Sequence, residues 1–540
     1  MSDARLWQSQ YPPGVPLVIE PPEHASLADR ILSACRRHLN RVAASCGGER
    51  LLYSDLERQS AALSAWLASA GFGKGQRIAL MLPNVLAQPV AMLAAHRLGM
   101  VVVNVNPLYT ARELRHQLND SGAVALVIAQ SALPVFAEVA AEVAVNTCVV
   151  VASPGDDVPR DWPHAGCRLT TFEATLRCDA TVPNVSVGHD DLAFLQYTGG
   201  TTGVSKGAML SHGNVLSNLA QVERWIAPLT EARLAVITAL PLYHIFALTV
   251  NSLLYLGRGA ELVLVTNPRD VDALVATLRA HPPGFITGVN TLFNALVSHP
   301  EIGTVDFSQL HMAMGGGTAI LAPTSRRWQA LTGAPIVQGY GLSEASPILT
   351  VCSPDEEFSG SIGYPVPSTD IEIRDPETGE ALPVGEQGEL CARGPQIMRG
   401  YWRREDQNDR TFHPGGWLRT GDVARMDPRG ALFVVDRTKD MILVSGFNVY
   451  PNEVESVCSE HPDIVESACI GVQDERTGEA VKVFVVRRNE ALSAEQVIEH
   501  CRRFLTPYKV PRQVDFLAQL PKSPVGKILR RELRTAATAT

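Results

Sequence analysis

Short apolar runs alternate with helical patterns along the first part of this chain, and this alternation most restricts its fold. The runs cover residues 77–82, 101–105, 124–128, 147–151, 234–240, 262–265, 285–289 and 336–338. Between the runs, apolar residues recur at helical spacing; a capping box of Ser54 and Glu57, for example, opens a helix that ends at Gly71. Such alternation predicts an α/β fold with layered, largely buried strands.

The character of the chain changes after Ser353. Residues 371–374, 388–392 and 431–435 are short strand-like runs separated by turn sequences, which predicts a β-rich subdomain. From Asp440 onward a strand at 480–486, a helix near 493–504 and a basic end predict a separate small α+β domain. We expect residues 153–187, rich in Pro, Asp and Cys, to be irregular and exposed.

The chain has 540 residues, more than one hydrophobic core usually supports, so at least two domains are expected. Net charge is -9 with acids and bases interspersed, which argues against a general nucleic-acid binder. Ten scattered cysteines without a C-x-x-C pair are typical of free thiols in a reducing cytoplasm. We see neither a signal peptide nor an apolar run long enough to span a membrane.

The most distinctive local sequence is Tyr197-Thr-Gly-Gly-Thr-Thr-Gly-Val-Ser-Lys-Gly207, which follows the apolar residues 192–195. A strand that opens into glycines and threonines can wrap backbone N–H groups and hydroxyls around phosphate oxygens. A Walker A loop needs Gly-Lys-Ser/Thr, whereas Lys206 stands between Ser205 and Gly207. The sequence therefore predicts a phosphate-binding loop that does not belong to a P-loop NTPase.

Two other interpretations of this loop stay open at this point. Clusters of Gly and Thr are often flexible surface linkers. In addition, Gly203-Val-Ser205-Lys-Gly207 matches the Gly-x-Ser-x-Gly nucleophile elbow of a serine hydrolase. That elbow requires a strand that runs directly into its first glycine, and polar residues intervene here.

Three acidic positions lie after predicted strands or turns. Glu344 follows Gln338-Gly-Tyr-Gly-Leu-Ser, and a carboxylate beside a phosphate loop can hold Mg²⁺. Asp422 and Asp436 follow turn-forming stretches, where a carboxylate could accept ribose hydroxyls. Taken singly, each of them would be explained as a solvated side chain or a surface ion pair.

Seven motifs in order make this chain resemble the acyl-adenylate-forming enzymes, and among them the bacterial long-chain fatty acid–CoA ligases. The motifs are YTGGTTGVSKGAML, PLYHIFAL, ITGVNTLFNAL, QGYGLSEASP, GWLRTGDVARMD, DRTKDMILVSGFNVYPNEVE and PKSPVGKILRREL. The resemblance covers nearly the whole chain. It implies a large N-terminal domain, residues 1–438, and a mobile C-terminal lid, residues 439–540, with the active site between them.

The resemblance also implies roles for individual residues. The ATP phosphates would be bound by Tyr197, Thr198, Gly199, Gly200, Thr201, Thr202, Gly203 and Lys206. The adenosine would be framed by Gly315, Gly316, Gly317, Gln338, Gly339, Tyr340, Ser343, Asp422 and Arg437. Thr198 and Glu344 would hold Mg²⁺, and His244 would stand near the substrate carboxylate and the acyl tunnel.

In the C-terminal lid, the resemblance makes Lys439 the hinge and Lys527 the residue that enters the site only for adenylation. Ser445, Gly446 and Phe447 would line the coenzyme A channel for the second half-reaction. Ser343 and Ser205 stand where the family more often has Thr and Ala or Pro, which we expect to tune the rate. The catalytic residues would thus be Lys527, Glu344, Lys206 and His244.

The implied reaction converts a long-chain fatty acid, ATP and coenzyme A to acyl-CoA, AMP and pyrophosphate, a step that feeds β-oxidation. Other possibilities are activation of aryl, amino or medium-chain acids, transfer to a carrier protein, the hydrolase with Ser205, and a nucleotide-binding regulator without chemistry. We expect a cytoplasmic enzyme, with peripheral contact at the inner membrane face left open. A dimer is compatible with the sequence.

Overall fold

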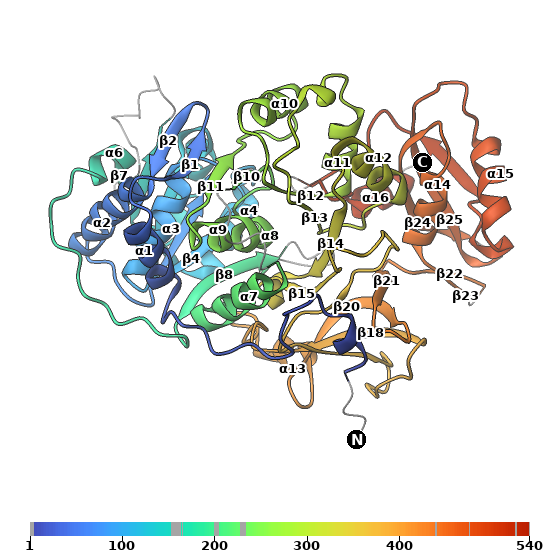
Figure 1. The fold of residues 1–540 in the computed structure, drawn as a ribbon, viewed down its shortest axis with the longest axis horizontal. Helices are drawn as coiled ribbons and strands as arrows, with labels where there is room; N and C mark the ends of the chain where they lie inside the picture. The colour runs from blue at the N-terminus through green and yellow to red at the C-terminus, as the bar shows by residue number, and fades with distance from the viewer. Residues whose placement is uncertain are drawn as a thin grey trace.

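The computed structural model describes residues 5–152, 164, 166–198, 205–226, 234–437, 440–445, 447–474, 476–523 and 526–538. Within these ranges the strands form four sheets. Two large sheets and their helices build the first part of the chain, and a β-rich layer and a small C-terminal domain follow (Figure 1). The predicted α/β class with a β-rich subdomain and a small α+β domain is confirmed.

The first large sheet carries the predicted phosphate loop between its last two strands. Its order is β7 (Arg168–Thr171), β6 (Thr147–Val151), β5 (Ala123–Ala129), β3 (Arg77–Met81), β4 (Val101–Asn104), β8 (Leu192–Thr198) and β9 (Lys206–Ser211). All neighbours are parallel except β8 and β9, which pair antiparallel. Parallel strands that are covered on both faces have continuous apolar sequences, which is why these strands could be predicted.

The second large sheet supplies the other side of the site. Its order is β16 (Tyr364–Pro365), β15 (Ile348–Val351), β14 (Ile336–Gly341), β13 (Met312–Gly315), β12 (Phe285–Gly288), β10 (Ala235–Thr238), β11 (Glu261–Leu264), β1 (Val42–Cys46) and β2 (Glu49–Leu52). From β10 to β14 the strands run parallel, so their carboxyl ends share one edge. Ligands of open α/β sheets bind at such an edge.

Helices cover both large sheets (Figure 1). They are α1 (Leu27–Arg37), α2 (Tyr53–Ser69), α3 (Ala87–Arg97), α4 (Ala111–Ser121), α7 (His212–Trp225), α10 (Val271–Ala280), α11 (Asn290–Ser298) and α12 (Ala322–Thr332). Buried apolar side chains from both sheets and from all of these helices except α4 form one continuous core. The other face of the first sheet has a smaller core of its own.

Two local predictions were wrong. Helix α2 begins at Tyr53, and the Asp55 carboxylate rather than Glu57 accepts the N–H of the capping residue Leu52 at 3.3 Å. Tyr53 is fully buried and its hydroxyl donates to the Ala260 carbonyl at 2.8 Å, which draws this residue into the first turn. The second error concerns the stretch expected to be irregular, where Arg168–Thr171 forms edge strand β7 and Phe172–Thr175 forms helix α6.

The β-rich subdomain and the C-terminal domain follow in sequence. The first contains β17 (Asp370–Arg374), β18 (Gln387–Arg393), β19 (Phe412–His413), β20 (Trp417–Met426) and β21 (Leu432–Arg437). The second contains β22 (Ile442–Val444), β23 (Phe447–Val449), β24 (Ile464–Asp474), β25 (Gly478–Arg487), β26 (Gln513–Phe516), α14 (Pro451–Ser459), α15 (Ala494–Phe504) and α16 (Arg530–Thr538). The C-terminal elements have their own hydrophobic clusters, separate from the main core.

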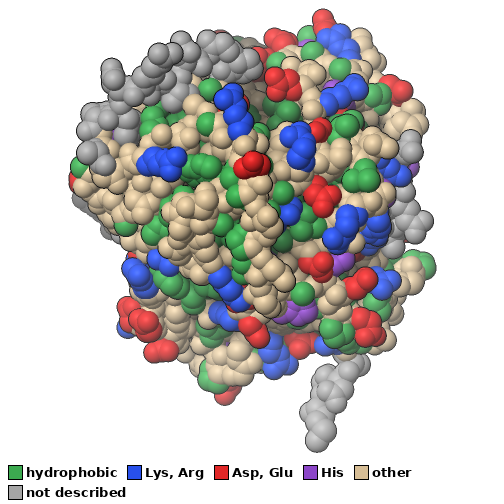
Figure 2. Space-filling view, turned by 90° about the vertical axis from the view of Figure 1, so that its left-hand side faces the viewer, with side chains coloured by type: hydrophobic (Ala, Val, Ile, Leu, Met, Phe, Trp, Pro, Cys, Tyr) green, Lys and Arg blue, Asp and Glu red, His purple; other side chains and the backbone are tan. Residues whose placement is uncertain are grey.

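The surface shows no gathering of one charge on the face drawn in Figure 2, where basic, acidic and apolar side chains are interspersed. All ten cysteines are free thiols, as the sequence predicted. Among the described residues, no helix combines the length and apolarity needed to cross a bilayer.

Candidate active site

The two ends of the phosphate loop lie side by side. Thr198 ends β8 and Lys206 begins β9, and the two residues are partners in the antiparallel register. The Ser205 hydroxyl donates to the Thr198 carbonyl oxygen at 2.6 Å, which closes the base of the loop. The loop residues Gly199, Gly200, Thr201, Thr202 and Gly203 lie outside the described residues.

The contacts of Ser205 do not resemble those of a hydrolase nucleophile. Its hydroxyl donates to a backbone carbonyl, and the His116 Nε2 contacts the Ser205 carbonyl oxygen at 3.0 Å rather than the hydroxyl. An activated serine needs a base within reach of its Oγ. The structure therefore disfavours the hydrolase interpretation.

Glu344 lies where a metal-binding carboxylate would be useful. It sits in the 3₁₀ turn η7 (Ser343–Ala345), directly after β14, and this turn contacts both β8 and β9. The turn that carries Glu344 is therefore next to the two strands that flank the phosphate loop. The Glu344 carboxylate oxygen and the Thr198 hydroxyl are the hard oxygen donors that Mg²⁺ prefers, so these residues fit the ion.

Tyr401 is a site residue that the sequence did not reveal. Its hydroxyl donates to the Glu344 Oε1 at 2.5 Å, and the Lys206 Nζ lies 4.7 Å from the centre of its ring. Burial, with the neighbouring Glu344 charge, raises the pKa of the Tyr401 phenol above its usual range, so the hydroxyl stays a donor. The only local signal was an aromatic pair after Gly400, which is also common in turns.

Tyr340 and Asp422 meet at the other end of the predicted nucleotide site. The Tyr340 hydroxyl donates to the Asp422 Oδ2 at 2.6 Å. Asp422 in β20 is also the register partner of Arg437 in β21, so the two predicted ribose residues are neighbours in the sheet. A carboxylate oriented in this way can accept ribose hydroxyls.

The Gly315–Gly317 run packs against β14. Gly315 and Gln338 are register partners, and the Gln338 amide accepts the Ile320 N–H at 3.1 Å and donates to the Ser361 carbonyl at 2.9 Å. A Cβ at Gly316 would lie 3.1 Å from the Gly339 carbonyl oxygen, so a larger residue would push the two strand ends apart. The predicted adenine residues thus form one tightly packed edge.

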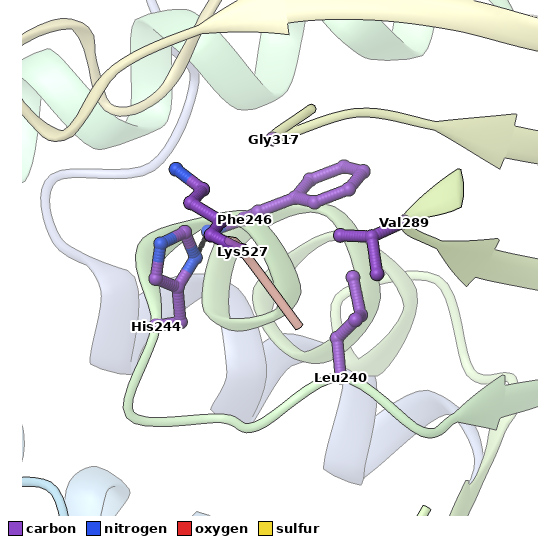
Figure 3. A pocket seen from close by; sticks show the side chains of 6 residues that line it. All are labelled: Leu240, His244, Phe246, Val289, Gly317 and Lys527. Atoms are coloured by element: carbon purple, nitrogen blue, oxygen red, sulfur yellow. Dashed lines mark hydrogen bonds between the residues drawn. The ribbon is translucent and has the colours of Figure 1, made fainter. Parts of the chain in front are cut away.

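Lys527 of the C-terminal domain reaches a small pocket in the N-terminal domain (Figure 3). The pocket encloses about 10 Å³ and is lined by Leu240, His244, Phe246, Val289, Gly317 and Lys527. Gly317 has φ +76°, and a Cβ there would lie 3.5 Å from the Lys527 Cε. The space holds about one water molecule, so this pocket is too small for an acyl chain.

His244 lies beside the Lys527 side chain in this pocket (Figure 3). Its Nδ1 accepts the Phe246 N–H at 3.4 Å. Burial lowers the pKa of His244 to about 3, and the Lys527 ammonium acts in the same direction. The imidazole is therefore neutral at physiological pH and does not repel the lysine.

The predicted coenzyme A residues lie at the turn between β22 and β23. Ser445 has φ 51° and its N–H donates to the Thr477 carbonyl at 2.8 Å. Phe447 is 56% exposed and stacks on Tyr508, with 4.9 Å between ring centres. Gly446 and the predicted hinge Lys439 lie outside the described residues.

The strands that flank the phosphate loop contact the turn after β14, and a lysine of the small C-terminal domain reaches the large domain. This arrangement is typical of a nucleotide-using enzyme. The chain belongs to the AMP-binding enzyme family. The family's main domain matches residues 32–402, and its C-terminal domain matches residues 453–527. A long-chain-fatty-acid–CoA ligase from Yersinia pestis is 48% identical, over 98% of this chain and 98% of its own length. One from Escherichia coli O157:H7 is 47% identical, over 99% and 98%.

Solved structures agree with this assignment. The crystal structure of ATP-bound MatB from Rhodopseudomonas palustris has a TM-score of 0.84 and 29% identity to this chain. The superposition covers 95% of this chain and 99% of that one. ATP is bound in that structure. In this chain, Lys206 begins a strand that contacts the Glu344 turn, and Lys527 lies in the pocket beside Gly317.

Proposed function

We propose that this protein is a long-chain fatty acid–CoA ligase that activates its substrate through an acyl-adenylate. ATP, coenzyme A and a long-chain fatty acid are the substrates, and acyl-CoA, AMP and pyrophosphate are the products. The observation that carries the proposal is Lys527, which stands beside His244 and Gly317 although it lies in the C-terminal domain. The near-full-length identity to ligases of this substrate class supports the choice of acid.

In the first half-reaction, a carboxylate oxygen of the fatty acid attacks the α-phosphate of ATP, and pyrophosphate leaves. Negative charge develops on the phosphoryl oxygens, where the Lys206 and Lys527 ammonium groups would donate hydrogen bonds. Asp422, oriented by Tyr340, would hold the ribose, and Gln338 with the glycines of residues 315–317 would frame the adenine. Neutral His244 would face the carboxylate without adding a second positive charge beside Lys527.

Mg²⁺, held by Glu344 and Thr198, would supply charge neutralisation on the phosphates when bound. This assignment is supported by the donor types and by the contact of the Glu344 turn with both arms of the loop. The rest of the loop, Gly199 to Gly203, would bind phosphate oxygens through its backbone.

In the second half-reaction, the coenzyme A thiol attacks the acyl carbonyl carbon and AMP leaves. We propose that the C-terminal domain, residues 439–540, turns about Lys439, withdraws Lys527 and brings Ser445, Gly446 and Phe447 to the site. The exposed Phe447 ring and the inserted Lys527 fit the adenylation orientation. Conformational alternation lets one cleft serve two reactions.

For its setting, we propose a cytoplasmic enzyme that supplies acyl-CoA to β-oxidation and meets its lipid substrate at the inner membrane face. The oligomeric state we propose to test is a dimer. Sedimentation of the purified protein measures its oligomeric state, and sedimentation with anionic lipid vesicles measures its binding to membranes. A monomer that does not bind vesicles would contradict the proposed dimer and the proposed membrane contact. It would not affect the proposed ligase reaction.

The deciding experiment is ATP–pyrophosphate exchange with saturated fatty acids of increasing length, together with benzoate and other aromatic acids. We expect exchange to rise with chain length, because each buried CH₂ contributes about 0.8 kcal/mol. Thioester formation is then compared with free coenzyme A and with an acyl carrier protein as acceptor. Exchange restricted to aromatic acids, or transfer only to the carrier protein, would replace the proposed function.

A further inference from the structure

Tyr401 connects two residues of the proposed phosphate site that come from different sheets. Its ring lies under the Lys206 Nζ at 4.7 Å, and its hydroxyl donates to the Glu344 Oε1 at 2.5 Å. We infer that Tyr401 is a positioning residue, which sets the place of the Lys206 ammonium relative to the Glu344 carboxylate. This inference rests on the proposed function, because it presumes that both groups act on ATP.

The backbone around Tyr401 is fastened along strand β9. The Met209 N–H donates to the Gly400 carbonyl at 2.9 Å, and the Trp402 N–H donates to the Gly207 carbonyl at 2.8 Å. Tyr401 and Ala208 form an isolated antiparallel bridge at the same place. Residues 398–402, which we call the crossing segment, therefore run beside the strand that begins with Lys206.

The crossing segment is also tied to the turn that carries Glu344. The Met398 N–H donates to the Glu344 carbonyl oxygen at 2.7 Å. One short piece of chain thus holds β9 through Gly400 and Trp402, and the η7 turn through Met398. The Tyr401 side chain then joins the functional groups of both elements.

Asp120 anchors the far end of the crossing segment. Its backbone oxygen accepts the Trp402 Nε1–H at 3.2 Å, and its carboxylate pairs with the Arg404 guanidinium. The same carboxylate accepts the Tyr197 hydroxyl at 2.6 Å, and Tyr197 belongs to β8, the other arm of the phosphate loop. The crossing segment therefore contacts β9 directly and β8 through Asp120. These contacts hold Tyr401 in a fixed position.

The two halves of the Tyr401 side chain have separable tasks. The ring attracts the Lys206 ammonium through its π face and restricts a flexible side chain. The hydroxyl orients the carboxylate by occupying Oε1, so that Oε2 is the oxygen presented to a cation. Tyr401→Phe removes only the second task, whereas Tyr401→Leu removes both.

ATP binding to the full-length protein, measured by calorimetry over a range of Mg²⁺ concentrations and in EDTA, tests the inference. Mg²⁺ should increase the affinity for ATP. We expect Tyr401→Phe to raise the Mg²⁺ concentration that gives half of this increase about tenfold, the scale of one hydrogen bond to a charged group. The affinity for ATP without metal should be unchanged. Tyr401→Leu should also weaken metal-free ATP binding, by about threefold. Pyrophosphate exchange should fall in the same order.

Tyr364→Phe is the matched control, because the Tyr364 hydroxyl donates to the Glu356 Oε1 at 2.7 Å outside the site. Its Mg²⁺ dependence should equal that of the unmodified protein. If Tyr401→Phe also behaves like the unmodified protein while Glu344→Gln loses the Mg²⁺ response, the inference is overturned and the proposed function stands. If Glu344→Gln keeps both the Mg²⁺ response and the exchange activity, the proposed phosphate site itself is wrong.

Discussion

The Asp436 carboxylate accepts the backbone N–H of Asn452 at 2.9 Å, across the proposed boundary between the two domains. Asp436 belongs to β21, and Asn452 lies in the first turn of α14, where a negative charge is favoured by the helix dipole. The Asn452 side-chain oxygen accepts from Arg530, which begins α16 just after Lys527. A chain of contacts thus links the end of the large domain to the element that follows Lys527.

Asp436→Ala should therefore slow the first half-reaction more than the second. The contact fixes the orientation in which Lys527 reaches the pocket, and an orientation without Lys527 inserted does not require it. We expect pyrophosphate exchange to fall about tenfold, the scale of a charged hydrogen bond, with thioester formation from supplied acyl-AMP changed less than threefold. Asp427→Ala, which removes a carboxylate from the β20–β21 turn, is the control and should show no such difference between the half-reactions.

Lys527→Ala should lower adenylation by at least about 10²-fold, because a transition-state charge donor is lost. Thioester formation from supplied acyl-AMP should be spared. Rapid-quench measurement of each half-reaction separates the two. Lys522→Ala is the matched control, because this lysine is close to Lys527 in sequence and pairs with Glu466 at 2.6 Å away from the pocket. Equal loss in both half-reactions for Lys527→Ala would contradict the assignment.

Tyr340→Phe should raise the KM for ATP about fivefold, the scale of one hydrogen bond, because Asp422 loses the donor that orients it. The KM for the fatty acid should not change, since Tyr340 contacts Asp422 on the proposed ribose side of the site. Initial rates at varied ATP and at varied fatty acid provide the comparison. An increase confined to the fatty acid KM would place Tyr340 on the acyl side instead.

Acid should destabilise the fold through buried histidines. His96 is fully buried beside His212, and burial lowers the pKa of His96 far below its usual range and that of His212 to about 4. The unfolded chain therefore binds more protons below about pH 6.5, and stability falls by about 1.4 kcal/mol per pH unit for each histidine until its folded pKa is reached.

His96→Leu should remove one of these contributions. Neither ring nitrogen of His96 has a hydrogen-bond partner among the described residues, so the substitution should cost little at pH 7.5. Between pH 6.5 and 5 the variant should lose less thermal stability than the unmodified protein. Melting curves across this range measure the slope, and an unchanged slope would show that His96 does not titrate on unfolding.

Much of the fold could be predicted because it depends on the local pattern of apolar residues. Strands β3 to β6, β10 to β12 and β14 were predicted within two or three residues, since buried parallel strands leave continuous apolar runs, whereas β13 was not predicted. The start of α2 was misjudged because the buried Tyr53, held by residues some two hundred positions away, outweighed the cap signal. Strand β7 is short and half polar, so its sequence shows neither the alternation of a strand nor the spacing of an amphipathic helix. The boundary at residue 438 stays a prediction.

The sequence by itself determined the alternating layers, the glycine-threonine loop and the order of motifs, because these depend on spacing along the chain. Only the tertiary structure decided that Tyr401 joins Lys206 to Glu344 and that Lys527 meets His244. Such contacts depend on how separate sheets and domains pack. Local sequence periodicity does not predict contacts between residues that are far apart in the chain.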